Sequence, residues 1–195
     1  LFGRDGQVIG EFATERRVVI EYDDMAPVLR QATIATEDGD FEQHFGLDPV
    51  RLVVAVARGL LPNQPMTGAS TITQQVARLL FLEDEYMIEG VFARRGLLGL
   101  ERKAREWLLA LQLEKRFTKR EILAFYANQS NLGPGIYGVE AAARGYFNKS
   151  ARDLTLDEAA SIAATFQTPS RLNPYTNPDA NVARRNGVLL PRMVA

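Results

Sequence analysis

Three polar segments of the sequence hold the residue types that glycan or phosphate chemistry requires. In the first, an apolar helical stretch ending at Thr36 leads directly to Glu37 and the polar, glycine-containing segment 37–46. A carboxyl group at the edge of an apolar helix loses hydration, which raises its proton affinity and suits a general base working near neutral pH. Taken alone, this segment has an alternative interpretation as a solvated acidic loop.

The second segment, residues 68–78, crowds hydroxyl and amide side chains into the first turns of a predicted helix that then presents a cation. The side chains concerned are Ser70, Thr71, Gln74, Gln75 and Arg78. Free hydroxyl and amide groups at a helix start can hold an anion or the hydroxyls of a sugar. Ordinary helix capping with a polar surface is the alternative.

The third segment places two cations around a carboxylate. Glu106 has Arg102 four residues before it and Lys103 three residues before it, so helical spacing makes all three neighbours. The cations are expected to keep Glu106 ionised, so Glu37 and Glu106 become candidates for different roles. A solvent-facing set of ion pairs is the alternative interpretation.

Composition limits the chemistry to carboxylates, hydroxyls, amides and cations. The 195 residues include no cysteine and a single histidine, His44, which excludes thiol catalysis, iron–sulfur clusters and multi-histidine metal centres. His44 is therefore interpreted as a structural residue, and Asp38-Gly39-Asp40 as a chance match to a metal-binding pattern. The net charge of −1 favours no nucleic-acid partner.

Residues 133–138 match a dinucleotide-binding fingerprint, but no βαβ unit is predicted around them, so a nucleotide site is not expected there.

Charge is nevertheless segregated along the chain. Residues 1–48 hold eleven acidic residues against four arginines, whereas residues 94–120 hold nine basic residues against three glutamates. The second of these regions is suited to meeting an anion.

The pattern of elements predicts a mainly α fold. A short β segment is predicted over residues 1–22, with a hairpin turn at Asp5-Gly6 and a strand at Val18–Tyr22, and at least six helices follow between residues 25 and 193. Helix starts are predicted at Asp48 with Pro49, at Thr118 with Glu121 and at Thr155 with Glu158. The helix over 101–116 is predicted to be largely buried, with Ala104, Leu108, Leu111 and Lys115 along one stripe and an apolar face broadened by Trp107, Ala110 and Leu113. The longest apolar run, Leu52–Ala57, is too short to span a bilayer. No signal peptide is visible, and because the chain opens on Leu1 an upstream segment is expected to be missing.

Read in order, these segments resemble the peptidoglycan glycosyltransferase domain, family 51, of class A penicillin-binding proteins. The resemblance covers nearly the whole chain. The motifs that carry it are Glu37-Asp38-x-x-Phe41-x-x-His44-x-Gly46, Gly68-x-Ser70-Thr71-Ile72-Thr73-Gln74-Gln75, Arg102-Lys103-x-x-Glu106 and Lys119-x-Glu121-Ile122-Leu123-x-x-Tyr126-x-Asn128.

The resemblance implies a two-lobed, lysozyme-like helical domain over residues 25–195, with a smaller lobe that dips into the outer face of the cytoplasmic membrane. Residues 1–24 are similar to the segment that follows the membrane anchor in bifunctional members, so an anchor absent from this chain, a periplasmic location and a transpeptidase domain in the full-length protein are expected. The implied reaction is polymerisation of lipid II into β-1,4-linked glycan strands by inverting glycosyl transfer, with undecaprenyl pyrophosphate leaving. No cofactor is required, although a divalent cation is expected to help neutralise the pyrophosphate.

Residue roles also follow from the resemblance. Glu37 is the general base on the acceptor hydroxyl, and Glu106 supports the donor-side charge arrangement and the leaving group. The substrate-binding residues are Ser70, Thr71, Gln74, Gln75, Arg78, Arg102, Lys103, Arg105 and Asn128. The supporting residues are Asp38, Phe41, His44 and Glu121. An inverting reaction is expected to keep the Glu37 and Glu106 carboxyl groups about 6.5 Å or more apart.

The sequence departs from the family pattern at three places. Arg78 stands where lysine is usual, residues 128–132 lack an aromatic residue before the glycine turn, and residues 81–100 form a longer stretch than expected. This stretch is either a membrane-contacting element or an amphipathic core helix, and it leaves Arg94 and Arg95 as alternatives for a further site arginine. A lysozyme-like hydrolase or lytic transglycosylase, and a catalytically idle glycan- or membrane-binding module, remain alternative functions.

Overall fold

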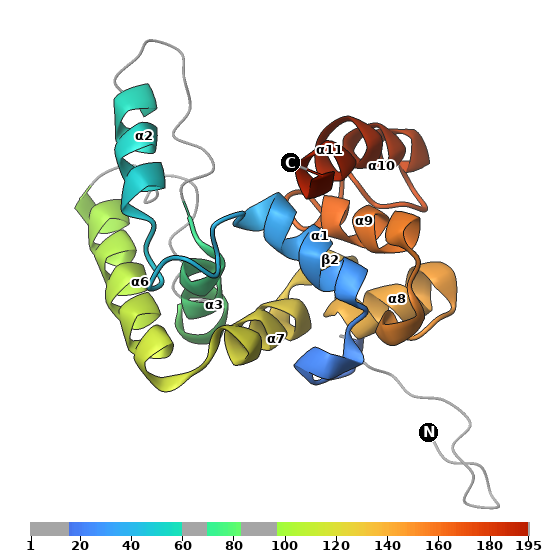
Figure 1. Ribbon diagram of the computed structural model, residues 1–195, viewed down its shortest axis with the longest axis horizontal. Coiled ribbons are helices and arrows are strands. Elements are labelled where there is room, and N and C mark those ends of the chain that lie inside the picture. Colours follow the sequence, from blue (N-terminus) through green and yellow to red (C-terminus); the bar gives the residue numbers. More distant parts are fainter. Residues whose placement is uncertain (1–15, 60–69, 83–96, 195) are drawn as a thin grey trace, which may run out of the picture.

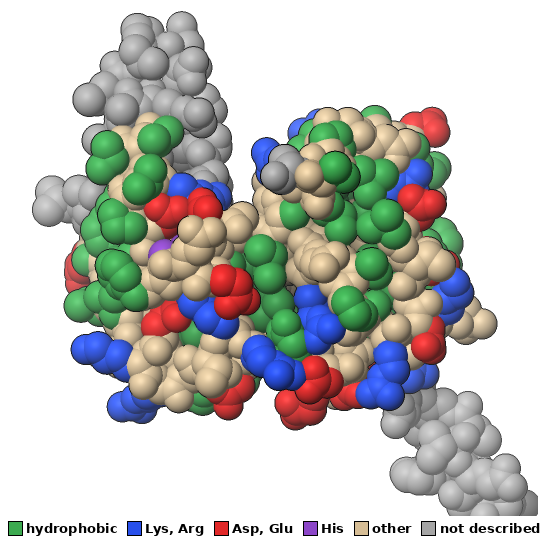
Figure 2. All heavy atoms as spheres, viewed as in Figure 1, with side chains coloured by type: hydrophobic (Ala, Val, Ile, Leu, Met, Phe, Trp, Pro, Cys, Tyr) green, Lys and Arg blue, Asp and Glu red, His purple; other side chains and the backbone are tan. Residues whose placement is uncertain are grey.

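Helices make up most of the chain over residues 16–59, 70–82 and 97–194, the part that the computed structural model describes (Figure 1). One group of helices comprises α2 (Pro49–Gly59), α3 (Ile72–Phe81), α6 (Leu97–Arg116) and α7 (Lys119–Gln129). The other comprises α1 (Pro27–Glu37), α8 (Val139–Phe147), α9 (Leu156–Thr165), α10 (Pro178–Arg184) and α11 (Leu190–Val194). Figure 2 shows a notch between the two groups, and the mainly α fold predicted from the sequence is confirmed.

Three apolar cores hold the helices together. Phe41, Ile72 and Ile122 are among the buried residues that pack α3, α6 and α7 together. A second core joins α7 to α1, α8 and α9, and a third, built largely of alanines, lets α1 and α9 approach closely. Phe166 packs against all three cores, so it lies where the two groups of helices meet.

The helix starts that the sequence predicts are confirmed. Asp48 Oδ1 accepts a hydrogen bond from Arg51 N at 2.9 Å, and α2 begins at Pro49. Thr118 forms a capping box at the start of α7, and Thr155 forms another at the start of α9. Each box satisfies backbone N–H groups that a helix start otherwise leaves unpaired.

The β structure differs from the prediction. The strands β1 (Arg16–Arg17), β2 (Asn131–Gly133) and β3 (Ile136–Tyr137) form a small sheet in the order β1-β3-β2. The predicted strand at Val18–Tyr22 is wrong, because Ile20 bonds through its backbone to the Asn128 side-chain amide rather than to a neighbouring strand. The predicted hairpin turn at Asp5-Gly6 lies outside the described residues.

The fingerprint at residues 133–138 serves this sheet. Gly135 and Gly138 have φ values of +69° and +83°, which allow β2 to turn into β3 and the chain to enter α8. A side chain at Gly138 would place its Cβ 2.8 Å from the carbonyl oxygen of Asn128. These glycines are therefore explained by the tight backbone path.

The predicted apolar face of α6 is correct in part. Ala110 and Leu113 are buried as predicted, whereas Ala104, Leu108 and Lys115 of the predicted stripe are exposed, Leu108 to 61%. The stripe was wrong because the buried face of α6 includes a carboxylate, Glu106, which hydrophobic patterning assigns to solvent. Among the described helices, none has the combined length and apolar character needed to cross a bilayer.

Candidate active site

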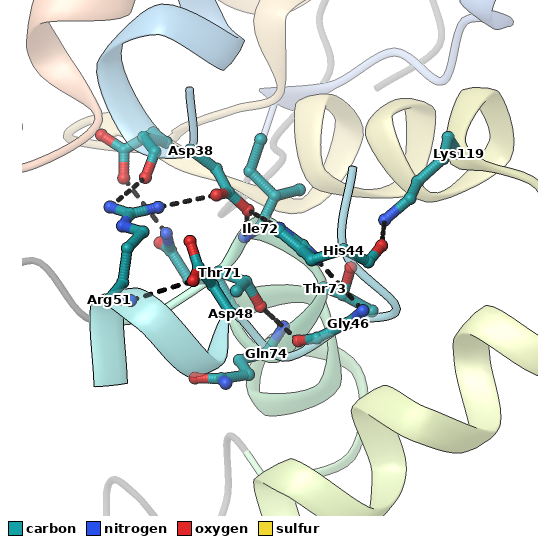
Figure 3. A network of polar contacts seen from close by, with 12 residues as sticks. Asp38, His44, Gly46, Asp48, Arg51, Thr71, Ile72, Thr73, Gln74 and Lys119 are labelled. Atoms are coloured by element: carbon teal, nitrogen blue, oxygen red, sulfur yellow. Dashed lines mark hydrogen bonds and ion pairs between the residues drawn. The ribbon is translucent and has the colours of Figure 1, made fainter. Parts of the chain in front are cut away.

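The turn after α1 is anchored by a completely buried carboxylate, Asp38 (Figure 3). Its Oδ1 accepts a hydrogen bond from Arg51 Nη1 at 2.6 Å, and its Oδ2 accepts bonds from His44 Nε2 and Ile72 N, each at 2.9 Å. Gly46 N donates to His44 Nδ1 at 3.1 Å, so the imidazole carries its proton on Nε2 and donates it to Asp38. Asp38 thereby ties the turn to the starts of both α2 and α3.

Further contacts hold the same turn against α7. Lys119 Nζ donates to the His44 carbonyl at 2.6 Å and to Glu114 Oε1 at 2.7 Å, and it lies 4.5 Å from the centre of the buried Phe41 ring. Thr71 Oγ1 donates to the Gly46 carbonyl at 2.6 Å. The turn that begins at Glu37 is consequently held by contacts from α2, from the start of α3 and from the start of α7.

We expect Asp38→Ala to destabilise the fold by about 3 kcal/mol, because it leaves Arg51, His44 and a buried backbone N–H without their shared acceptor. In a chain of this size that corresponds to a fall in melting temperature of roughly 6–12 °C, measured by circular dichroism. Asp40→Ala removes an exposed carboxylate from the same turn and serves as the matched control. Equal melting temperatures for the two variants would contradict the anchoring role of Asp38.

Glu37, the last residue of α1, places its carboxyl group beside Gln75. Its Oε2 accepts a hydrogen bond from Gln75 Nε2 at 3.1 Å, and its Oε1 is buried with no hydrogen-bond partner among the described residues. Desolvation raises the pKa of Glu37, while the Gln75 hydrogen bond and the positive charges of Arg184 and Arg51 oppose that rise. The raised proton affinity predicted from the sequence is confirmed.

Glu106 lies in a second cluster, at the contact of α6 with the start of α3. It is 1% exposed, with Oε2 2.7 Å from Lys103 Nζ and Oε1 3.1 Å from Arg102 Nη1. Lys103 Nζ also donates to Ser70 Oγ at 2.9 Å and to Gln74 Oε1 at 3.2 Å. The alternative of solvent-facing ion pairs is therefore wrong for Glu106.

A pocket of about 310 Å³ lies beside Gln75. It is lined by Gln75, Arg78, Leu79, Tyr126, Ser130, Asn131, Phe166 and Pro169. A second pocket of about 300 Å³ shares the lining residues Asn131 and Pro169 with it. The first pocket reaches Gln75, the residue that donates a hydrogen bond to Glu37.

Comparison with known proteins identifies the family. A model described as transglycosylase matches residues 5–194. The chain belongs to the transglycosylase family. Penicillin-binding protein 1A of Aquifex aeolicus is 40% identical over 189 residues, which cover 97% of this chain and 24% of that protein. Penicillin-binding protein 1A of Escherichia coli is 41% identical over 194 residues, which cover 100% of this chain and 21% of that protein.

The structural comparison agrees. A crystal structure of penicillin-binding protein 1A from Haemophilus influenzae matches with a TM-score of 0.51 and 26% identity, over 98% of this chain and 17% of that one. The chain spans about a fifth to a quarter of the length of the curated relatives it matches. The transglycosylase domain is thus a peptidoglycan glycosyltransferase, as its sequence motifs predicted.

Several predicted site residues of the transglycosylase domain have structural roles. The buried Asn128 amide exchanges hydrogen bonds of 2.8 and 3.0 Å with the Ile20 backbone. Thr71 is fully buried and caps α3 through Gln74 N. A substrate contact by either residue stays a prediction. Glu121 caps α7. The hydrogen bond that its carboxylate accepts from the backbone N–H of Thr118 lowers the pKa of Glu121.

The remaining predicted residues divide by position. Ser70, Gln74, Arg102 and Lys103 gather around Glu106, and Gln75 and Arg78 line the pocket beside Glu37. Arg105 pairs with Glu101 at 2.7 Å on an exposed part of α6. Arg94 and Arg95 lie outside the described residues.

Two residues of the transglycosylase domain with no predicted role also lie at the site. Arg184 acts on Glu37 electrostatically from the end of α10. Tyr126 lines the pocket from α7 and contacts Gln75. Tyr126 lies inside a recognised motif, whereas no local sequence signal links Arg184 to a carboxylate 147 positions earlier.

Proposed function

We propose that this domain polymerises lipid II into β-1,4-linked glycan by inverting transfer, with undecaprenyl pyrophosphate as the leaving group. The observation that carries the proposal is that consecutive residues of α3 connect two unlike carboxylates. Gln75 bonds Glu37, whose second oxygen is buried and unpaired in the described structure, and Gln74 bonds Lys103, which is paired with Glu106. Two neighbouring residues of α3 therefore contact a proton acceptor on one hand and a cationic cluster on the other, which supports the proposal.

The proposed mechanism gives each cluster one task. The 4-hydroxyl of the acceptor sugar attacks the anomeric carbon of the growing chain, and its proton passes to the Glu37 carboxylate as the carbon–oxygen bond to pyrophosphate breaks. Lys103, Arg102 and Arg78 stabilise the negative charge that develops on the departing pyrophosphate. Glu106 holds Lys103 and Arg102 in place, which supports the preorganisation that such electrostatic catalysis requires.

We also propose that the reaction needs no resident cofactor. A divalent cation would act only by neutralising pyrophosphate charge alongside the cations already named. Both oxygens of Glu106 are paired with Arg102 and Lys103 and one oxygen of Glu37 is bonded to Gln75, so the two clusters offer few oxygens to a metal ion.

Contact with the outer face of the cytoplasmic membrane is part of the proposal. Apolar side chains are exposed along α2 and just before it, with Val50 72%, Val53 67% and Phe45 58% exposed, and they gather at the upper left of Figure 2. Phe81, at the end of α3, is 54% exposed. Apolar side chains grouped in this way favour contact with a lipid surface, where a lipid-linked substrate would be found.

The longer protein is proposed from the lengths of the relatives. Because the matched penicillin-binding proteins are several times longer than this chain, we propose that a transpeptidase domain accompanies it and that a separate anchor holds it at the periplasmic face. A mass measurement of the native gene product tests the first point.

Incubating the detergent-solubilised protein with labelled lipid II tests the activity. Long glycan chains are the expected product. Shortening of preformed glycan would instead indicate a hydrolase or lytic transglycosylase, and binding without turnover would indicate an idle module. With lipid II embedded in sedimentable vesicles, the protein is expected to sediment with them, and a protein that stays in the supernatant would contradict membrane contact.

A further inference from the structure

Gln75 is bonded at both ends of its amide. Its Nε2 lies 3.1 Å from Glu37 Oε2, and its Oε1 lies 3.4 Å from the Tyr126 hydroxyl. An ionised carboxylate only accepts hydrogen bonds, so the amide must turn its NH₂ group toward Glu37 and its carbonyl toward Tyr126. The tyrosine hydroxyl is then the donor to Gln75.

We propose that Tyr126 is a positioning residue for the general base. Its hydroxyl donates to Gln75 Oε1 and so supports the amide orientation in which Gln75 Nε2 donates to Glu37 Oε2. This inference rests on the proposed function of Glu37, because positioning a base matters only where that base acts.

Tyr126 is itself held rigidly. It is 2% exposed, and its ring stacks on Phe166 with centroids 5.0 Å apart and planes 29° apart. Burial, together with the nearby Glu37 carboxylate, raises the pKa of Tyr126 well above its ordinary value. The hydroxyl therefore keeps its proton and remains a donor over the whole working pH range.

Without its contact to Tyr126, the Gln75 amide would be freer to turn over, which would disfavour the ionised form of Glu37. If the Gln75 amide turned over, its carbonyl would face Glu37 Oε2, and the repulsion between the two oxygens would favour the protonated carboxyl group. The other charges facing Glu37 are Arg184, Arg51 and Asp38, and Arg78 faces Tyr126. All four remain when only the tyrosine hydroxyl is removed, so the change tests the contacts that this hydroxyl makes with Gln75 and with Glu37.

Tyr126→Phe keeps the stacked ring and removes the hydroxyl. We expect kcat/KM for glycan polymerisation to fall about three- to tenfold on the acid side of the pH profile, because one hydrogen bond to a charged group is weakened. The loss is expected to disappear at higher pH, where Glu37 is ionised in both proteins. A loss of the same size at every pH would overturn the proposal.

A direct titration separates this inference from the proposed function. The ¹³C signal of the Glu37 carboxyl group, assigned by its absence from Glu37→Gln, is expected to titrate at higher pH in Tyr126→Phe than in the unaltered protein. This readout needs no substrate, so it decides the role of Tyr126 even if no glycan polymer is formed. An unchanged Glu37 titration would overturn the inference.

Two further variants complete the test. Gln75→Met is expected to raise the pKa of Glu37 as well, and adding Tyr126→Phe to it should raise that pKa little further if Tyr126 acts mainly through Gln75 rather than by its direct contact with Glu37. Additive shifts would contradict that route. Tyr146→Phe is the matched control, since it also loses a buried tyrosine hydroxyl, one that bonds the Leu132 carbonyl, and it is expected to leave the titration of Glu37 unchanged.

Discussion

Replacing Glu37 by glutamine is expected to lower kcat/KM for glycan polymerisation by about a thousandfold, because the only proton acceptor proposed for the attacking hydroxyl is lost. The amide keeps the size of the carboxyl group and can still accept from Gln75 Nε2, so the site keeps its shape. The rate is measured with labelled lipid II at saturating and subsaturating concentrations. Polymerisation at the unaltered rate would remove Glu37 from its proposed role.

The same variant is expected to melt no lower than the unaltered protein at pH 7. Burial raises the pKa of Glu37 in the folded state, so the fold favours the protonated carboxyl group. The stability that this preference contributes is present below the ordinary glutamate pKa and is lost as pH rises through the raised value. Glutamine, which is neutral at every pH, escapes that loss.

Glu42→Gln provides the matched control for both measurements. Glu42 lies five residues after Glu37 in the same turn but is exposed to solvent. Its substitution is expected to change neither the rate nor the melting temperature beyond the usual range of surface replacements. A stable but inactive Glu37→Gln protein, beside an active Glu42→Gln protein, would identify a residue whose function is obtained at the expense of stability.

The sequence predicted best what depends on neighbouring residues. The capping boxes at Thr118 and Thr155 and the proline-led start of α2 need only local spacing, and all three are confirmed. The desolvation of Glu37 was also predicted, because the apolar helix before it and the polar turn after it are continuous in the chain.

Contacts between residues that are distant in the chain could not be predicted from the sequence. Asn128 could not be recognised as the partner of Ile20, and that pairing is what keeps residues 18–22 out of a strand. The burial of Glu106 on α6 was missed because this carboxylate is compensated by Lys103 and Arg102 of its own helix, whereas α3, which packs on α6, is distant in the sequence. The predicted separation of the Glu37 and Glu106 carboxyl groups stays a prediction.

Lys103→Met is expected to lower kcat by about a hundredfold to a thousandfold, the usual effect of removing one preorganised donor from a developing oxyanion. Lys103 Nζ donates hydrogen bonds to Ser70, Gln74 and Glu106, so the position of the cation is fixed before substrate binds. Methionine keeps the apolar stem without the charge. The rate is measured with labelled lipid II, with Lys115→Met, an exposed lysine of the same helix, as the control.

Lys103→Arg separates charge from geometry. Arginine keeps the positive charge, but its planar guanidinium cannot reproduce the three donor directions that an ammonium group offers to Ser70, Gln74 and Glu106. We therefore expect a rate between those of Lys103→Met and the unaltered protein. If arginine restored nothing over methionine, the cation would act through packing around Glu106 rather than on pyrophosphate, and the electrostatic mechanism would be contradicted at this residue.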